Sequence, residues 1–245
     1  MHLDQPNKLT IMKAKILIVF IVIITWSCTN SVNYSESFKK ETAGYYLYNP
    51  DELIEVYYEG NVLFLNWKEG KIEPVALEEN EFFVADMYKK FRFVQHPETK
   101  ARYLSVIPEG DEAKITYDYL KAPKGYKTPS MHLKDGNYKE ALEGYLDIKK
   151  EDSTSSYINE WSFNKIGYKH MSNHEYDKAI ETLKINAALH PNSINVYDSL
   201  AEAYLLKGDS LQAYNNYKKV LDISPTSKRA KRFVEGNASK FQKSL

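Results

Sequence analysis

The chain has 245 residues, of which 43% are hydrophobic and 27% are charged, a composition that suits one or two folded domains rather than a disordered chain. Its 33 basic and 33 acidic residues give a formal net charge of zero. This balance indicates neither a polycation that binds nucleic acid nor an acidic tail, so we expect no nucleic-acid partner.

The N-terminal segment has the three parts of an export signal. Lys13 and Lys15 precede an apolar run over residues 16–26, which is about half as long as a membrane-spanning helix. Small Ser27 then stands directly before Cys28, the only cysteine of the chain. These features predict a signal peptide over residues 1–27, with Met12 as its working start.

Residues 25–28, Thr-Trp-Ser-Cys, resemble a lipobox, the cleavage site of bacterial lipoprotein signals. The resemblance implies that Cys28 carries the lipid and begins the mature chain. A lone cysteine forms no internal disulfide, which agrees with this use. The alternative is an ordinary secretory signal with an incidental cysteine. Residues 28–43 are polar and are predicted to form a tether.

The membrane that holds the anchor is inferred by analogy. Thr29 differs from the Asp that retains lipoproteins in the inner membrane of enteric bacteria, and no acidic surface-export run follows Cys28. We therefore expect a lipid anchor in the cell envelope, in the outer membrane and facing the periplasm.

Residues 44–123 have a hydrophobic pattern with a period of two. Apolar residues at 54, 56 and 58 alternate with other types, and turn residues such as Gly60-Asn61 recur every 8–12 positions. Such alternation predicts short strands joined by hairpins. The further strands expected are residues 62–67, 82–85, 91–95, 103–107 and 115–120. The sequence therefore predicts an antiparallel β domain of six to eight strands without a helix of useful length.

From residue 137 the period becomes helical, and the sequence repeats itself at a spacing of 34 residues. The repeated pairs are Phe163 and Tyr197, Ile166 and Leu200, Gly167 and Ala201, Ala179 and Ala213, Leu183 and Tyr217, and Pro191 and Pro225. This pattern resembles the tetratricopeptide repeat (TPR). The resemblance implies two antiparallel helices in each of the units 160–193 and 194–227, with small residues where the helices cross.

An incomplete unit precedes these two. Residues 128–134 are too short for a full first helix, and Ala141 lies 38 residues before Ala179, which indicates an insertion of about four residues within 151–156. Residues 227–245 are predicted to form a polar capping helix, which a repeat stack needs at its end. The predicted fold is therefore α+β, with an antiparallel β domain over 44–123 followed by about 2.5 TPR-like repeats over 124–245.

No catalytic constellation can be assembled from the sequence. Residues 37–40 (SFKK), 157–159 (YIN) and 127–129 (KTP) imitate the motifs of penicillin-recognising serine enzymes, but in the wrong order and setting. His170 and His174 have the spacing of two zinc ligands, yet the repeat places a turn between them. We expect no enzyme activity, no metal and no cofactor.

The first helix of each pair lines the groove of such a stack. The predicted partner-binding residues are Trp161, Asn164, Tyr168, Asn195, Asp198 and Glu202. Asp198 and Glu202 would make the groove partly acidic, so a terminal carboxylate is not the expected ligand. A groove of this size suits a peptide segment or one helix of a protein partner.

The leading hypothesis is a non-catalytic, lipid-anchored protein–protein interaction module of the bacterial cell envelope. The chain also resembles the C-terminal accessory region of β-lactamase-related serine hydrolases of Bacteroidetes-type bacteria, through residues 77–83 (LEENEFF) and the order of the domains. The catalytic domain is missing, so hydrolase activity is not implied.

Three alternatives stay open at this point. The chain could bind a small molecule or glycan through the β domain, serve as an accessory fragment of a serine hydrolase system, or be an enzyme of unrecognised type. The basic cluster of Lys228, Arg229, Lys231 and Arg232 is interpreted as the solvated face of the cap, with a docking surface for anionic lipid or an acidic partner as the alternative.

Overall fold

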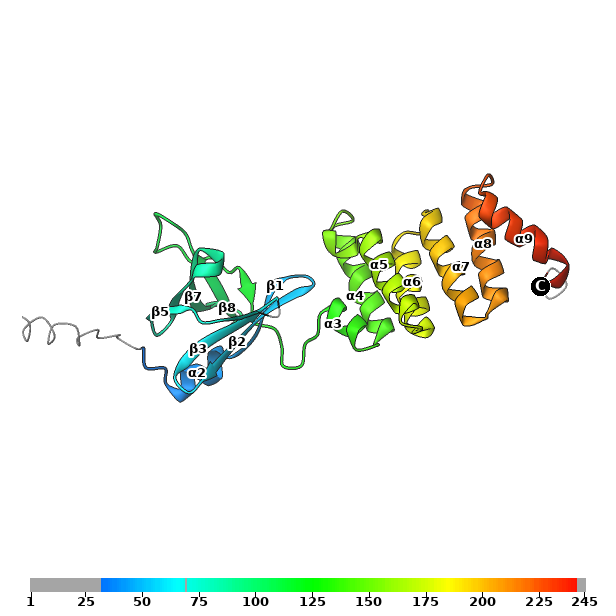
Figure 1. The fold of residues 1–245 in the computed structure, drawn as a ribbon. Coiled ribbons are helices and arrows are strands. Elements are labelled where there is room, and N and C mark those ends of the chain that lie inside the picture. The colour runs from blue at the N-terminus through cyan, green and yellow to red at the C-terminus, as the bar shows by residue number, and fades with distance from the viewer. Residues whose placement is uncertain (1–31, 69, 242–245) are drawn as a thin grey trace, which may run out of the picture.

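The computed structural model describes residues 32–68 and 70–241, which form a β domain followed by a row of helices (Figure 1). The strands are β1 (Gly44–Asn49), β2 (Glu52–Glu59), β3 (Val62–Trp67), β4 (Gly70–Ile72), β5 (Val75–Glu78), β6 (Glu81–Val84), β7 (Lys89–Gln95), β8 (Arg102–Ile107) and β9 (Tyr119–Leu120). The α-helices are α2 (Glu36–Thr42), α3 (Pro129–Lys134), α4 (Tyr138–Glu151), α5 (Glu160–Ser172), α6 (Tyr176–Leu189), α7 (Ile194–Lys207), α8 (Ser210–Ile223) and α9 (Lys228–Phe241).

The strands form two antiparallel sheets in which each strand pairs with its neighbours in the chain. Strands β1 to β4 make one sheet and β5 to β9 the other, and an isolated bridge from Tyr46 to Lys121 joins them. The predicted antiparallel class is confirmed, and the expected strand over residues 62–67 coincides with β3.

The last expected strand, residues 115–120, is wrong over most of its length, since only Tyr119–Leu120 pair as β9. Before residue 119, side-chain hydrogen bonds take the place of the backbone hydrogen bonds between strands. The Thr116 amide donates to Ser105 Oγ at 2.9 Å, and the carboxylate of Asp118 accepts from the Val106 amide at 2.7 Å. The strand pattern in the sequence does not reveal this substitution.

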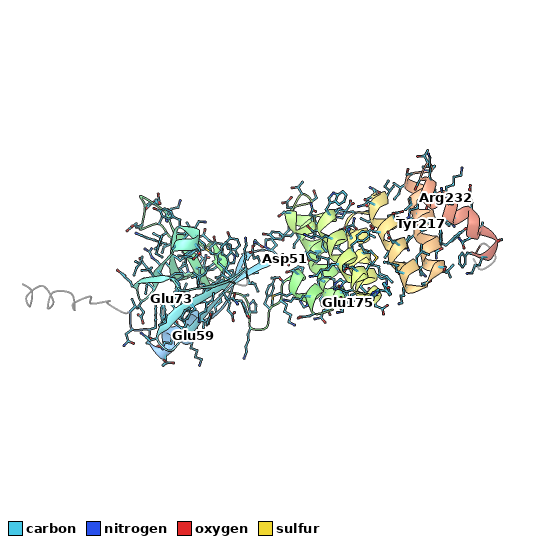
Figure 2. The ribbon with its side chains drawn as sticks, in the orientation of Figure 1. Asp51, Glu59, Glu73, Glu175, Tyr217 and Arg232 are labelled. Carbon is cyan, nitrogen blue, oxygen red and sulfur yellow. The ribbon has the colours of Figure 1, made fainter. Side chains whose placement is uncertain are left out.

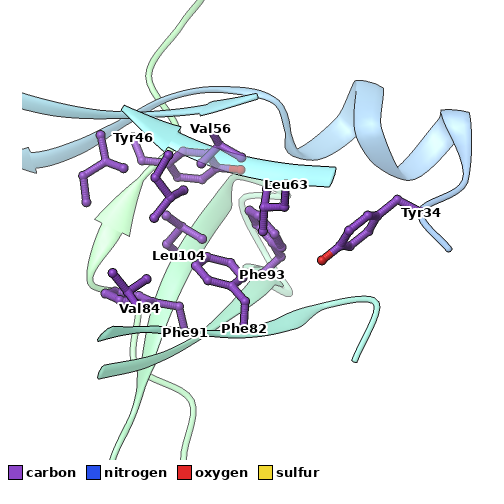
Figure 3. Packing of buried hydrophobic residues seen from close by; sticks show 11 residues of the cluster. Tyr34, Tyr46, Val56, Leu63, Phe82, Val84, Phe91, Phe93 and Leu104 are labelled. Carbon is purple, nitrogen blue, oxygen red and sulfur yellow. The ribbon is translucent and has the colours of Figure 1, made fainter. Parts of the chain in front are cut away.

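The core of the β domain lies between the two sheets, where alternate residues of the strands meet (Figure 3). Phe82, Phe91 and Phe93 form its aromatic centre, with ring centroids 5.4–5.7 Å apart for the pairs with Phe82. Such aromatic burial supplies much of the stability of a small domain.

The N-terminal segment contributes to this core, which corrects the prediction of a polar tether over residues 28–43. Tyr34 and Thr42 are buried, and Thr42 Oγ1 lies 2.7 Å from Tyr58 Oη. Ser35 caps α2 by accepting from the Phe38 amide, and Tyr34 stacks on the Phe38 ring. A polar composition conceals the one apolar face of this short helix, so the folded domain includes residue 34.

The two complete repeats follow the predicted register. Helices α5 and α6 begin 34 residues before α7 and α8, respectively. Gly167 lies where α5 crosses α6, because a Cβ there would stand 2.7 Å from the Leu183 side chain. Gly208 ends α7 in the left-handed conformation with φ of 88°. The prediction of paired helices with small crossing residues is confirmed.

The first unit has only part of its first helix. With the 38-residue offset, α3 corresponds to the last six residues of α5. The turn between β1 and β2 contacts the start of α3, where Asp51 accepts from the Ser130 amide at 2.7 Å (Figure 2). Burial and the nearby Asp51 carboxylate raise the pKa of the Tyr145 hydroxyl on α4. The β domain thus meets the helical stack where the missing turns would begin.

Candidate functional site

The predicted groove face belongs to the first helices of the repeat, α5, α7 and α9. These helices begin at residues 160, 194 and 228, so α9 continues the 34-residue register as a first helix, and no second helix follows it within the described residues. Equivalent groove positions are therefore held by Trp161, Asn195 and Arg229. Helix α9 packs through buried Ala230 against a cluster that includes Tyr217 of α8.

The N-terminal part of this groove presents aromatic surface. Trp161 is 72% exposed, although tryptophan is a large apolar side chain that proteins usually cover. Tyr168 is also exposed and lies two turns further along α5. Between the repeats, the side-chain amide of Asn195 donates from Nδ2 to Glu160 Oε1 at 2.8 Å. This arrangement leaves the Trp161 ring free to contact a ligand.

A charged network crosses the middle of the groove. Arg229 donates from Nη1 to Asp198 Oδ2 at 2.8 Å and from Nη2 to Glu202 Oε2 at 3.2 Å. The Tyr168 hydroxyl donates to the same Glu202 oxygen at 3.2 Å. Burial raises the pKa of Asp198, and the nearby Arg229 guanidinium opposes that rise.

This network corrects the expectation that Asp198 and Glu202 make the groove acidic. Both carboxylates are paired with one guanidinium that comes from the helix after them. The sequence does not assign Arg229 to the groove, because residues 227–245 are interpreted as a solvated cap rather than as a further first helix. The signal is present in the sequence, since residue 229 lies 34 positions after Asn195.

Asn164 is not a groove residue, which corrects its prediction as a partner contact. Its side chain is 4% exposed, and its Oδ1 accepts from Asn186 Nδ2 at 3.0 Å. Asn186 also donates to the Glu160 carbonyl at 3.1 Å. A buried amide needs such partners, so the pair ties α5 to α6. The other five predicted residues are exposed or partly exposed, and their role as partner contacts stays a prediction.

A hollow of about 570 Å³ lies between α7, α8 and α9. Leu205, Tyr217 and Phe233 supply its apolar lining, and Lys228, Arg229 and Arg232 supply its charges. Figure 2 places Tyr217 and Arg232 near each other at this end of the stack. We call this hollow the C-terminal pocket.

The two histidines considered as zinc ligands have separate partners. His170 Nδ1 lies 2.7 Å from Glu175 Oε2, whereas His174 Nδ1 lies 2.8 Å from the Tyr176 hydroxyl. Lys178 and His170 together lower the pKa of Glu175 to about 2. Within the described residues, no three His, Cys, Asp or Glu side chains gather as a metal site would require.

The signal peptide and Cys28 lie outside the described residues, so the lipid anchor stays a prediction. Among the helices that the structure describes, none combines the length and the apolarity needed to cross a bilayer.

The fold and the groove define the class of this protein. It is an α+β chain in which an antiparallel β domain precedes a TPR-like region, where antiparallel helix pairs recur every 34 residues. No protein-family model matches the chain, and no curated protein matches it in sequence.

Several solved structures are similar to the helical region. The first TPR of Spaghetti (RPAP3) bound to an HSP90 peptide is 17% identical with a TM-score of 0.31, covering 45% of this chain and 85% of that one. A point mutant of MamA is 18% identical with a TM-score of 0.36, covering 48% and 85%. The Yersinia enterocolitica secretion chaperone SycD, in complex with a YopD peptide, is 17% identical with a TM-score of 0.32, covering 46% and 88%.

Proposed function

We propose that this chain is a non-catalytic, lipid-anchored module that binds a protein partner through the groove of α5, α7 and α9. The exposed Trp161 ring carries the proposal, because an uncovered tryptophan beside hydrogen-bonding side chains is typical of a peptide contact. The fixed network of Tyr168, Glu202 and Arg229 supports it, since a preorganised groove loses less entropy on binding.

The lipid at Cys28 would hold this groove beside a membrane of the cell envelope, with the outer membrane facing the periplasm as the proposed location. The export signal before Cys28 supports this part of the proposal. A fatty-acid analogue fed to cells should label the wild-type chain, and Cys28→Ser should abolish that label. A wild-type chain that takes no label would contradict the anchor.

Site-specific photocrosslinking tests the groove. A photoreactive amino acid at position 161 should give one discrete crosslinked product in intact cells. The same amino acid at position 219, which is exposed on α8, is the matched control and should give none. Equal products from both positions, or none from position 161, would refute the groove as the binding surface. A serine-reactive probe should leave the chain unlabelled; a labelled serine would overturn the non-catalytic part of the proposal.

A second candidate function, glycan binding by the β domain, is favoured by one observation. Tyr88 is 78% exposed, with its backbone held at φ of 51°, and its ring stands edge-on to Phe83 at 5.9 Å. Together with Lys90 these rings line a hollow of about 350 Å³. Sugar faces stack on such rings, so binding to a glycan array that Tyr88→Ala abolishes would establish this function. Binding that survives the substitution would exclude Tyr88 as its cause.

A further inference from the structure

The C-terminal pocket has an excess of positive charge. Arg229 is already paired with Asp198 and Glu202, and its guanidinium carbon stands 5.8 Å from the centre of the Tyr217 ring. Lys228 and Arg232 line the pocket, and neither forms an ion pair or hydrogen bond with any residue that the structure describes. Among the described residues that line the pocket, none carries a carboxylate. An anion could therefore meet two uncompensated cations there.

The walls of the pocket distinguish it from an ordinary solvated helix face. Tyr217 is fully buried and packs on Phe233 with ring centroids 4.9 Å apart, and Leu205 covers the α7 side. Apolar walls lower the local dielectric and strengthen the attraction between an anion and nearby cations. By contrast, Lys231 lies on the same helix but does not line the pocket, and it stands 3.9 Å from Glu235.

We propose that the C-terminal pocket binds a carboxylate of the partner, so that the groove takes an acidic peptide segment. This inference rests on the proposed function of the groove. The guanidinium of Arg232 can donate two parallel hydrogen bonds to a carboxylate, and Lys228 adds a second charge. A concave pocket with apolar walls suits a single side chain or a chain end, whereas a lipid surface is met by a flat or convex basic face.

Peptide pools provide the test. The probes are N-acetylated, C-amidated dodecamers of mixed sequence in which one position is fixed as Glu, Gln or Lys, and the measurement is their retention on the immobilised full chain. The Glu pool should be retained about tenfold better than the Gln pool, since a hydrogen bond to a charged group contributes roughly that factor. The Lys pool should be retained least.

Matched variants locate the effect. The double substitution Lys228→Gln with Arg232→Gln should abolish the preference for Glu, whereas Lys231→Gln on the outer side of α9 should leave it unchanged. Trp161→Ala should weaken the retention of all pools by the same factor, because it removes a contact that does not involve charge. Pools with a free C-terminal carboxylate distinguish a chain end from a side chain as the source of the anion, and a preference for either source supports the pocket.

Three outcomes would overturn the proposal. Equal retention of the Glu and Gln pools that still depends on Trp161 would leave the groove as a peptide site and reject the carboxylate. Retention of no pool would reject the groove itself, and the pocket with it. Binding to phosphatidylglycerol vesicles that the double variant abolishes, without any preference among the pools, would assign the cations to a lipid surface.

Discussion

At the N-terminal end of the helical stack, α3 supplies six residues where α5 and α7 supply 13 and 14, and the β1–β2 turn occupies the place of the missing turns. At the C-terminal end, α9 is a full first helix of 14 residues, and the described part of the chain adds no second helix behind it. The β domain thus covers the N-terminal end of the stack. At the C-terminal end, the basic side chains of Lys228 and Arg232 line the C-terminal pocket.

The charges at the two ends have different effects. Asp51 accepts from the backbone amide of Ser130, so its loss leaves that donor without its partner. Arg229 bridges two carboxylates at a half-exposed surface, where solvent screens the pairs. The N-terminal contact therefore contributes to stability, whereas the C-terminal contact sets the charge of the groove.

The packing of the two ends of the stack differs most at two glycines, one at each end. A Cβ at Gly144 of α4 would stand 2.6 Å from the Pro129 ring, whereas a Cβ at Gly236 of α9 would meet nothing within 4 Å. Gly144→Val should lower the free energy of unfolding by about 3 kcal/mol because it forces α3 away from α4. Gly236→Val should stay within about 0.5 kcal/mol of wild type. Urea denaturation of both variants checks this; equal effects would contradict the tight packing assigned to the N-terminal end.

Removal of the Asp51 side chain should have the next largest effect. Asp51→Ala leaves the Ser130 amide without its acceptor, which should cost about 2 kcal/mol of unfolding free energy. Asp51→Asn keeps an acceptor for the amide and should retain most of the stability. Thermal unfolding followed by circular dichroism compares the two variants. If alanine and asparagine behaved alike, the hydrogen bonds of Asp51 would not explain the contact.

The same carboxylate gives the contact a pH dependence. Burial raises the pKa of Asp51, against hydrogen bonds from Ser130 and others that lower it. Because the folded pKa lies above the unfolded one, the stability contribution is fully present below the unfolded value of 3.8 and is lost as the pH rises through the folded value. The Tm of wild type minus that of Asp51→Asn should therefore fall as the pH rises from about 3.5 to about 7. A difference independent of pH would show that Asp51 titrates as it does in the unfolded chain.

The sequence predicts the repeats well because their signal is local and recurs. Fixed spacing marks Gly167 and the aligned prolines, so the starts of α5 and α7 follow from periodicity alone. The β domain is predictable in class but not in its start, since the segment around α2 joins the core through only a few side chains, among them Tyr34 before the helix and Phe38 within it. Short helices with one narrow apolar face leave little periodic signal.

The groove is less predictable than the helices that carry it. Asn164 occupies a groove position in the repeat pattern, yet its amide turns inward because Asn186 on the paired helix offers a buried partner. That pairing depends on the contact between two helices and not on spacing within one. Arg229 is available from the 34-residue register, but the polar composition of α9 favours a cap. Which side chains face the groove can therefore be determined only from the three-dimensional structure.

Replacement of Arg229 should have the smallest effect on stability and the clearest effect on recognition. The side chain is half exposed, so Arg229→Met should change the free energy of unfolding by no more than about 1 kcal/mol. Without the guanidinium, the charges of Asp198 and Glu202 lose their cation, and the preference among peptide pools should shift from Glu toward Lys. Lys231→Met is the matched control, since it removes the same charge from the same helix outside the pocket. An unchanged preference in Arg229→Met, measured by the same retention assay, would mean that the network at α7 and α9 does not set the charge that a ligand meets.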